Sequence, residues 1–190
     1  MRNLYVFNMI TVDGFFEGAQ KWDLGWHNVD AEFNDFAIAQ LDDTGMLLFG
    51  RVTYQGMAGY WASPDAIKDD AQVANRMNAI PKAVFSRTLE KADWNNTRLI
   101  KTNIPEEILK LKQASGKEIA LFGSANLMAT LAQHNLVDEY RLIVNPVVLG
   151  KGGPLFAETL GPLKLKLLQA RPFKSGNVLL CYQPEPLKTG

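Results

Sequence analysis

Apolar residues near the start of the chain come in short runs that alternate with a stretch of helical periodicity. The run 4–10 ends just before an Asp-Gly pair, which supplies turn chemistry, and it predicts a first strand. Apolar side chains at helical spacing across 33–41, with acids between them, predict a helix of about three turns that Asn28 or Asp30 caps. The apolar run 46–49, which a glycine ends, predicts a strand buried on both faces.

The segment 17–28, between the first strand and this helix, has no periodicity. It is composed of glycines and polar residues together with Trp22 and Trp26. Two interpretations stand with equal weight: a mobile loop that crosses a cleft, or an apolar flap that shields a surface from solvent.

The same alternation continues along the chain. Ser63, Pro64 and Asp65 have the pattern of an N-cap, a first-turn proline and a first-turn acid, so a helix is expected after Ser63. The remaining patterns predict, in order, a strand over 83–85, a short strand over 99–100, a helix over 105–114 that Gly116 ends, a buried strand over 118–122, and a helix that carries Leu127, Met128 and Leu131.

The C-terminal part predicts strands only. A long strand over 140–149 contains Pro146 and is therefore expected to be bent or at a sheet edge. Two further runs, 163–167 and 177–183, are separated by a short turn and should pair antiparallel. These elements predict the α/β class, a three-layer α/β/α domain over 1–190 whose mixed, mostly parallel sheet ends in antiparallel strands, with 184–190 as a loose tail.

The charge balance limits the partners that this chain can recognise by its overall field. Its 190 residues contain 20 Lys+Arg and 20 Asp+Glu, for zero formal net charge and a pI near 6.7. Binders of nucleic acid or anionic membranes carry clustered basic residues, so neither partner is expected. An anion bound here must be held by local geometry.

The cellular compartment can also be predicted. Apolar residues never run for the roughly 18 positions that a membrane span needs, and no signal-peptide pattern follows Arg2. Cys181, the single cysteine, lies in an apolar run and is interpreted as a buried strand residue in a reducing compartment. A cytoplasmic protein is expected.

Four polar segments follow predicted strands, where ligands bind in open α/β sheets. Gly50–Thr53 opens a helical stretch, so backbone N–H groups and Arg51 could bind a phosphate; alternatively, Gly50 permits a tight turn and Arg51 pairs with a surface acid. Ser86–Thr88 offers two hydroxyls around a base, which suits a phosphate, although a plain polar turn is the commoner structure.

The other two segments are Gly123–Asn126 and Thr11–Gly14. Gly123 and Ser124 precede a helix and would let a phosphate approach the backbone, although they form neither a GxGxxG nor a P-loop motif. The glycine-rich segment 150–154 leads into a turn and a strand rather than a helix, and we expect a loop there with Lys151 exposed.

Other chemistry has weaker candidates. His27 and His134 lack partners at metal-ligand spacing, so a structural role is expected for both and no metal site is predicted. Asp13, Glu32 and Asp35 could each serve as a proton source in a partly buried cleft. The alternatives are an Asx turn for Asp13 and a solvated helix face for Glu32 and Asp35.

The ordered motifs TVDGFF, FGRVTYQGM, VFSRTL, IALFGSANLMATL and LVDEYRLIVNPVVLGKGGPLF resemble one known group of proteins. They are similar to the dihydrofolate reductase-like superfamily, in the branch related to the reductase domain of the riboflavin-biosynthesis deaminase-reductase. The resemblance extends from Leu4 to about Tyr182. It implies the dihydrofolate reductase-like fold, a homodimer, and NADPH as the cofactor of hydride transfer to a pterin-like or ribosylamino-pyrimidine-like substrate.

The same resemblance implies a set of cofactor-binding residues. By it, the segments at 50–53 and 86–88 would contact the adenosine phosphates, 123–126 would approach the pyrophosphate and nicotinamide ribose, and 11–16 would lie beside the nicotinamide. The residues concerned are Thr11, Gly50, Arg51, Thr53, Ser86, Arg87, Thr88, Gly123, Ser124, Ala125 and Asn126.

Two departures from the family pattern leave an alternative open. Dihydrofolate reductases proper have a Gly-Gly pair where this chain has Gly123 and Ser124, and Glu32 and Asp35 compete for the position of the acid that supports substrate protonation. The leading hypothesis is an NADPH-dependent reductase of a small heterocycle. The alternative is a catalytically silent nucleotide-binding or ligand-sensing module with the same fold.

Overall fold

A computed structural model describes residues 1–156 and 161–185 of this chain. The strands are β1 (Leu4–Thr11), β2 (Phe15–Glu17), β3 (Thr44–Gly50), β4 (Lys82–Phe85), β5 (Thr97–Ile100), β6 (Glu118–Phe122), β7 (Glu139–Asn145), β8 (Gly153–Pro154), β9 (Leu165–Pro172) and β10 (Val178–Pro184). The helices are α1 (Ala31–Asp42), α2 (Arg51–Trp61), α3 (Pro64–Ala79), α4 (Ile104–Gln113) and α5 (Ala125–Gln133).

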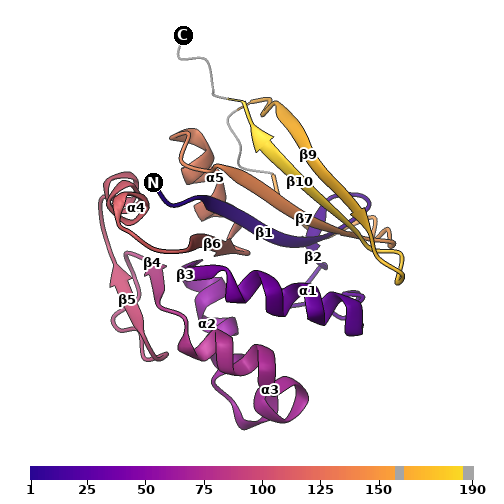
Figure 1. Cartoon of the computed structure of the whole chain (residues 1–190), viewed down its shortest axis with the longest axis horizontal. Helices are drawn as coiled ribbons and strands as arrows, with labels where there is room; N and C mark the ends of the chain where they lie inside the picture. Colours follow the sequence, from indigo (N-terminus) through magenta and orange to yellow (C-terminus); the bar gives the residue numbers. More distant parts are fainter. Residues whose placement is uncertain (157–160, 186–190) are drawn as a thin grey trace.

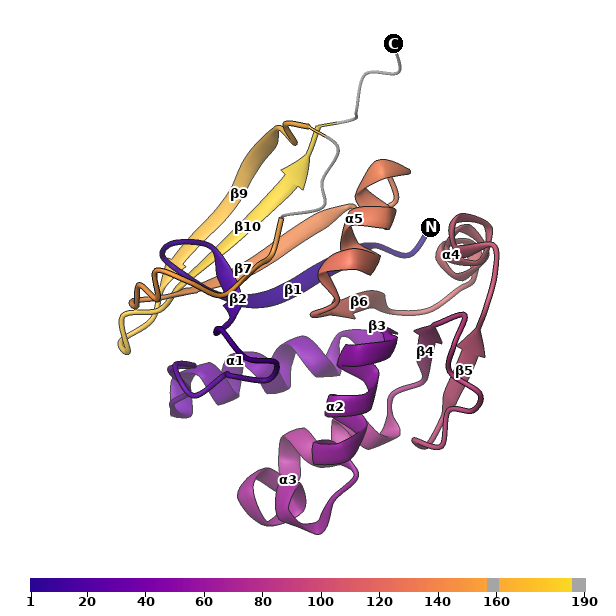
Figure 2. The same cartoon turned by 180° about the vertical axis from the view of Figure 1, so that it is seen from behind.

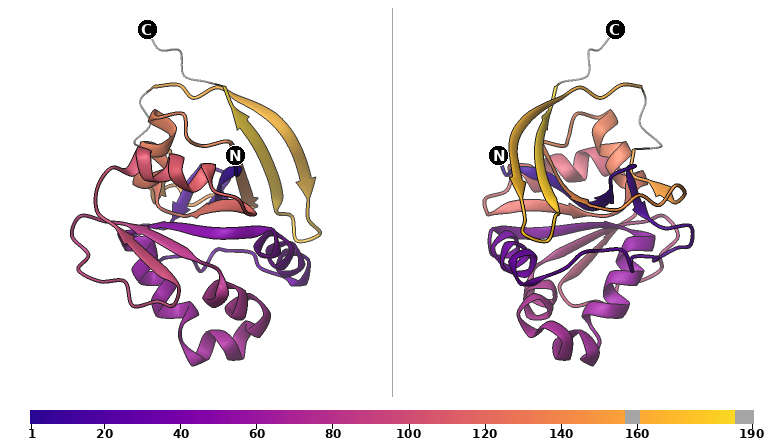
Figure 3. Two further views of the ribbon diagram at one scale, coloured as in Figure 1. Left: turned by 60° about the vertical axis from the view of Figure 1, so that its left-hand side comes forward. Right: turned by 90° about the vertical axis from the view of Figure 1, so that its right-hand side faces the viewer.

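Eight of the strands form one sheet in the order β5-β4-β3-β6-β1-β7-β10-β9 (Figure 1). The strands from β5 to β7 pair in parallel, whereas β10 pairs antiparallel with both β7 and β9. Helices α4 and α5 cover one face of the sheet, and α1, α2 and α3 cover the other (Figure 3). The predicted three layers and the antiparallel C-terminal strands are confirmed.

The burial pattern of β1 shows why these residues form a central strand. Leu4 and Val6 pack among the side chains of α4 and α5, while Tyr5 packs with those of α1, α2 and α3 on the opposite face. All three are fully buried. Burying such a side chain stabilises the fold by roughly 1.5–3 kcal/mol, so the continuous apolar run specifies a strand covered on both faces.

The prediction for the strand over 140–149 is wrong at its end, and of the two alternatives for it, bent or at a sheet edge, the edge position is wrong. Strand β7 stops at Asn145, because Pro146 has no N–H to donate to the ladder. It is also an interior strand between β1 and β10, and the edge strands of this sheet are β5 and β9.

Two other expectations at the C-terminal end need correction. Gly153 and Pro154 form the short strand β8, which pairs with β2, so the expected loop over 150–154 ends two residues early. Lys151 is exposed as predicted. Pro184 belongs to β10, so the expected loose tail cannot begin there. The rest of that tail, 186–190, lies outside the described residues.

Side chains cap α1 and α3 at the predicted points. Asp30 accepts a hydrogen bond from Phe33 N at the start of α1, and Ser63 accepts one from Ala66 N at the start of α3. Asp70 inside α3 leaves the helical conformation with φ −151° and ψ 86°, and its carboxylate accepts a hydrogen bond from Val73 N. Asp70 therefore caps a second helical segment, a break that the apolar stripe alone did not predict.

Cys181 is buried in β10 as predicted, and burial raises the pKa of its thiol to about 11. Among the described residues, none of the helices combines the length and the apolar character that crossing a membrane requires.

Asn78 joins three parts of the fold through its amide. Its Nδ2 donates to Trp61 O and Ala74 O at 2.7 and 2.8 Å, and its Oδ1 accepts from Trp94 Nε1 at 2.6 Å. Because these partners are partly buried, we expect Asn78→Ala to lower the free energy of unfolding by about 1–3 kcal/mol. Urea unfolding followed by tryptophan fluorescence measures this change.

The matched control for this prediction is Asn75→Ala, on the same helix. Asn75 is exposed, so its replacement should change the free energy of unfolding by no more than about 0.5 kcal/mol. Equal losses in the two variants would contradict the role assigned to Asn78.

Candidate active site

The four polar segments identified from the sequence all lie at the carboxyl ends of the parallel strands, which we call the carboxyl edge of the sheet. Strands β4, β3, β6 and β1 are neighbours and run parallel, so their carboxyl ends meet there. The chain passes from β1 to β3 and later inserts β6 between them, which makes this edge the point where the strand order reverses. Such points are where open α/β sheets bind ligands.

The Ser124 hydroxyl joins two of these segments. Its Oγ accepts a hydrogen bond from Gly50 N at 2.7 Å and donates one to Thr53 Oγ1 at 2.9 Å. The structure therefore brings Gly50, Thr53 and Ser124 into one group, although Ser124 is more than seventy residues from the other two in the sequence.

The backbone at Gly123 and Ser124 is left-handed, with φ +60° at both residues. A Cβ atom on Gly123 would lie 2.9 Å from Thr53 Cγ2, so a glycine is required by the close approach as well as by φ. Ser124 adopts a conformation that costs a non-glycine residue roughly 1–2 kcal/mol. Strain of this kind persists where the surrounding contacts enforce it, and the hydroxyl bonds of Ser124 do so.

The N-termini of α2 and α5 both open at this edge without a side-chain cap. Their first-turn N–H groups are free to donate, and the dipole of each helix favours a negative charge there. Arg51 begins α2 and is exposed; its guanidinium donates to Gln55 at 3.1 Å. Within the described residues it pairs with no acid, contrary to the alternative considered from the sequence.

The segment after β4 forms the expected polar turn and also leaves a base and a hydroxyl exposed. Ser86 Oγ accepts hydrogen bonds from Leu89 N at 2.9 Å and Thr88 N at 3.2 Å, which is the polar turn. Arg87 and Thr88 are exposed beside this turn. Since Phe85 pairs with Gly50, Arg87 follows the strand next to the start of α2.

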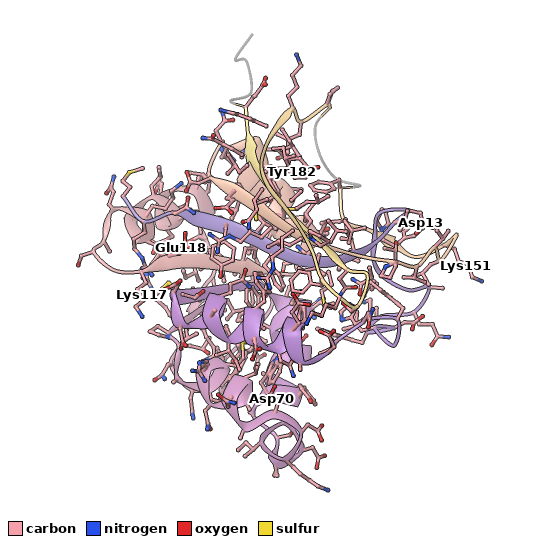
Figure 4. All side chains as sticks on the ribbon, turned by 45° about the vertical axis from the view of Figure 1, so that its right-hand side comes forward. Asp13, Asp70, Lys117, Glu118, Lys151 and Tyr182 are labelled. Atoms are coloured by element: carbon pink, nitrogen blue, oxygen red, sulfur yellow. The ribbon has the colours of Figure 1, made fainter. Side chains whose placement is uncertain are left out.

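Thr11 and Asp13 hold the loop after β1 in place. The buried Thr11 hydroxyl donates to Asp13 at 2.6 Å and accepts from Phe15 N at 3.0 Å. Asp13 also accepts from Leu149 N and Gly150 N, and Figure 4 shows it beside the loop that carries Lys151. These hydrogen bonds lower the pKa of the Asp13 carboxyl, and the bond from Thr11 has the largest effect. Asp13 is therefore an ionised acceptor within a turn.

The two carboxylates on α1 have different surroundings. Glu32 accepts a hydrogen bond from Lys174 N at 2.9 Å and pairs with Arg171 at 3.1 Å. Both contacts lower the pKa of the Glu32 carboxyl, and the bond from Lys174 N has the larger effect. Asp35 is exposed on the helix. Glu32 is thus held in an ion pair, whereas Asp35 has the solvated helix-face position that was its alternative.

An aromatic cluster, which the sequence analysis did not identify as part of a site, lies on the α1 side of the sheet. Its members are Phe7, Phe36 and Phe122, with ring centroids 5.3 Å apart for Phe7–Phe122 and 6.2 Å for Phe7–Phe36. Phe7 packs against core side chains of both the α1 and the α2 regions. The sequence shows that the first strand and the first helix contain aromatic residues, but only the tertiary fold brings these rings into contact.

A set of asparagine contacts was also missed. Asn28 N donates to Asn145 Oδ1 at 2.8 Å, Asn28 Nδ2 donates to Ser175 O at 2.8 Å, and Asn177 Nδ2 donates to Asn28 O at 2.7 Å. The neighbouring His27 is mostly buried, which lowers its pKa to about 4 and keeps the imidazole neutral at pH 7. These contacts fix the end of the 17–28 segment to the carboxyl end of β7.

The described residues contain no group of three His, Cys, Asp or Glu side chains that could hold a metal ion. A cavity of about 190 Å³ lies at the opposite end of the sheet, between the end of α5 and the end of β10. It is separate from the four segments described above.

A family model described as the RibD C-terminal domain matches residues 2–179 of this chain. The chain is also 36% identical over 175 residues to YyaP of Bacillus subtilis (strain 168), a protein described as uncharacterized. That match covers 91% of this chain and 90% of YyaP.

Solved structures share the fold at low sequence identity. A deaminase/5-amino-6-(5-phosphoribosylamino)uracil reductase of Thermotoga maritima superposes with a TM-score of 0.69 at 14% identity, over 96% of this chain and 56% of that one. Dihydrofolate reductase of Enterococcus faecalis, in a complex with NADP(H), superposes with a TM-score of 0.64 at 14% identity, over 97% of each chain.

The Ser124 geometry makes a prediction about two substitutions. Ser124→Ala loses both hydroxyl bonds and keeps the left-handed strain, whereas Ser124→Gly loses the same bonds and removes the strain. We expect both variants to be less stable than the wild type, with Ser124→Gly more stable than Ser124→Ala by about 1–2 kcal/mol. Urea unfolding measures the difference, and equal stabilities would show that the φ of Ser124 carries no strain.

Proposed function

This chain belongs to the RibD C-terminal domain family, and we propose that it is an NADPH-dependent reductase that transfers a hydride to a small pterin-like or ribosylamino-pyrimidine-like heterocycle. One observation carries the proposal: the uncapped N-termini of α2 and α5 are tied together by Ser124 at the carboxyl edge of the sheet. Two such helix ends side by side suit the two phosphates of a dinucleotide.

The residues at this edge fit NADPH from one end to the other. Gly123, Ser124, Ala125 and Asn126 would hold the pyrophosphate through the start of α5, where the missing side chain of Gly123 leaves the backbone accessible. The exposed segments that contain Arg51, Thr53, Arg87 and Thr88, together with Gly50 and Ser86, would hold the adenosine phosphates. The buried Thr11 would border the nicotinamide.

NADPH, when bound, supplies the hydride, and the protein supplies binding and orientation. The aromatic cluster lies on the α1 side of the sheet and includes Phe7 of β1, the strand that ends at Thr11. Flat rings of this kind can pack on a flat heterocycle. This side of the site is the proposed substrate side. The neighbouring dihydrofolate reductase complex with NADP(H) supports the cofactor assignment by its fold.

A second candidate function has its own supporting observation. Glu32, one of the two acids on α1 that could support substrate protonation, is engaged by Arg171 and by Lys174 N. This engagement favours a silent nucleotide-binding or ligand-sensing module that keeps the cofactor half of the site. NADPH binding without NADPH oxidation, across dihydrofolate, pterins and phosphoribosylamino-pyrimidines, would select this alternative.

The reductase proposal predicts the effect of removing either exposed arginine. Arg51→Ala or Arg87→Ala should weaken NADPH binding by about 1.5–3 kcal/mol, the scale of a charge-assisted hydrogen bond, which is roughly tenfold or more in Kd. Titration with NADPH and NADH, followed by tryptophan quenching, measures both affinities. A loss confined to NADPH places that arginine at the 2′-phosphate.

The control for the arginines is Arg98→Ala, because Arg98 pairs with Glu107 on α4 instead. It should leave both affinities unchanged. A wild-type protein that binds neither cofactor below the millimolar range would contradict the proposed function. If Arg51→Ala and Arg87→Ala both leave the two affinities unchanged, the arginines have structural roles only.

We also propose that the protein is a cytoplasmic homodimer. Strand β9 is a sheet edge, its Leu167 and Leu168 are 52% and 51% exposed, and an edge strand can pair with its own copy. Sedimentation should give twice the chain mass of 21.2 kDa, and Leu167→Lys should shift the protein toward monomer. A wild-type mass of one chain would contradict the proposal.

A further inference from the structure

The segment between β2 and α1, residues 18–30, links separate parts of the site, and we call it the strap. Figure 2 shows it passing in front of α1 toward α2. Its first part is a compact turn closed by Gly18 N and Asp23 O at 2.9 Å, with Trp22 N donating to Glu17 at 3.3 Å. Trp22 has φ +65°, a left-handed conformation that costs a non-glycine residue free energy.

The Trp22 side chain lies directly against the backbone of α2. A Cβ atom on Gly56 would overlap Trp22 Cζ2 and Cε2, far inside van der Waals contact. Any other residue at position 56 would therefore displace the indole. Since Trp22 remains 40% exposed, it rests on the surface of α2 rather than in the core.

The two attachments of the strap differ in kind. At its far end, Asn28 makes three hydrogen bonds, to Asn145, Ser175 and Asn177, and this end is held by buried polar groups. At the near end, the Trp22 indole makes an apolar contact with α2 at Gly56, and Trp22 N donates to Glu17 at 3.3 Å. The Trp22 contact is therefore the one that can release while the Asn28 contacts hold.

The strap thus connects the start of α1 and the carboxyl end of β7 to the middle of α2. The aromatic cluster of Phe7, Phe36 and Phe122 lies on this same side of the sheet, and Phe7 packs with core residues of both helix regions. The strap spans the side of the site assigned above to the substrate. Of the two interpretations of this segment from the sequence, the contact supports a crossing loop with a specific docking point.

We propose that Trp22 is a positioning residue, which docks in the notch at Gly56 and thereby holds the strap across the α1–α2 side of the site so that the substrate is enclosed beside Thr11. Trp22 itself touches α2 and acts through the strap. The inference rests on the proposed reductase function for the identity of what is enclosed, whereas the docking itself is independent of that function.

The test uses two glycine-to-alanine variants on one helix. Gly56→Ala places a methyl group where the indole lies, and Gly59→Ala, the matched control, places one where nothing lies within 4 Å. Alanine is the better helix former at both positions, so α2 should stay folded in each variant. The Trp22 side chain lies on an exposed loop, so its indole can leave the surface of α2 without unfolding the protein.

Limited trypsin digestion reads the state of the strap, because Lys21 precedes Trp22 and is exposed. Cleavage of a closed segment follows the population of its open form, so Gly56→Ala should be cut after Lys21 on the order of tenfold faster than the wild type or Gly59→Ala. Mass spectrometry identifies the cut. Equal cleavage of the two variants would overturn the docking.

Kinetics separate a positioning role from a merely structural one. With NADPH and the substrate that the reductase assay turns over, Gly56→Ala should raise the substrate KM by roughly fivefold or more, with kcat and the Kd for NADPH within about twofold, because the strap contributes binding and leaves the cofactor segments untouched. Faster cleavage with an unchanged KM would overturn the positioning role.

A second variant guards against an indirect effect of the new methyl group. Trp22→Ala should reproduce both results, and adding Gly56→Ala to it should produce no further change, since the two residues act through one contact. Additive effects would overturn the proposal. If the wild type binds no NADPH, the proposed function fails and the enclosing role falls with it, while the trypsin comparison still decides the docking.

Discussion

The site depends on one hydroxyl. Ser124 Oγ accepts from Gly50 N and donates to Thr53, and so it fixes the start of α5 against the start of α2. The contact holds Ser124 in a strained left-handed conformation and requires glycine at position 123. Because both helix ends are otherwise uncapped, a single side chain determines that two sets of free N–H groups face the same place.

Zero net charge is compatible with this arrangement because the charges are segregated by edge. At the amino end of β7, Arg141 is bound by Glu118 and Glu139 and lies 3.8 Å above the ring of Tyr5, so it contributes little positive field outside. Figure 4 places Glu118 at the opposite end of the sheet from Asp13. At the carboxyl ends of the parallel strands, Arg51 and Arg87 remain exposed, so a protein of zero net charge carries positive charge where we propose that the cofactor phosphates bind.

The sequence predicted what local patterns determine and missed what distant contacts determine. Apolar runs predicted the strands and the edge where the polar segments gather, since β1, β3, β4 and β6 are each buried by their own composition. Pro146 was placed inside a strand because the apolar pattern continues past it, while the ladder needs an N–H that proline lacks. The partners of Glu32 are 139 and 142 residues away, and no periodicity reveals them.

The break at Asp70 has a consequence for how the molecule opens. Because this residue leaves the helical path and starts a new hydrogen-bonded segment, residues 64–69 share no continuous ladder with the part of α3 that buries Val73, Ala74 and Met77. The first segment buries one residue, Ala66, so it should open more readily than the second, whose amide protons exchange when the core beneath them opens. One carboxylate thus divides a single helix into two units of unequal local stability.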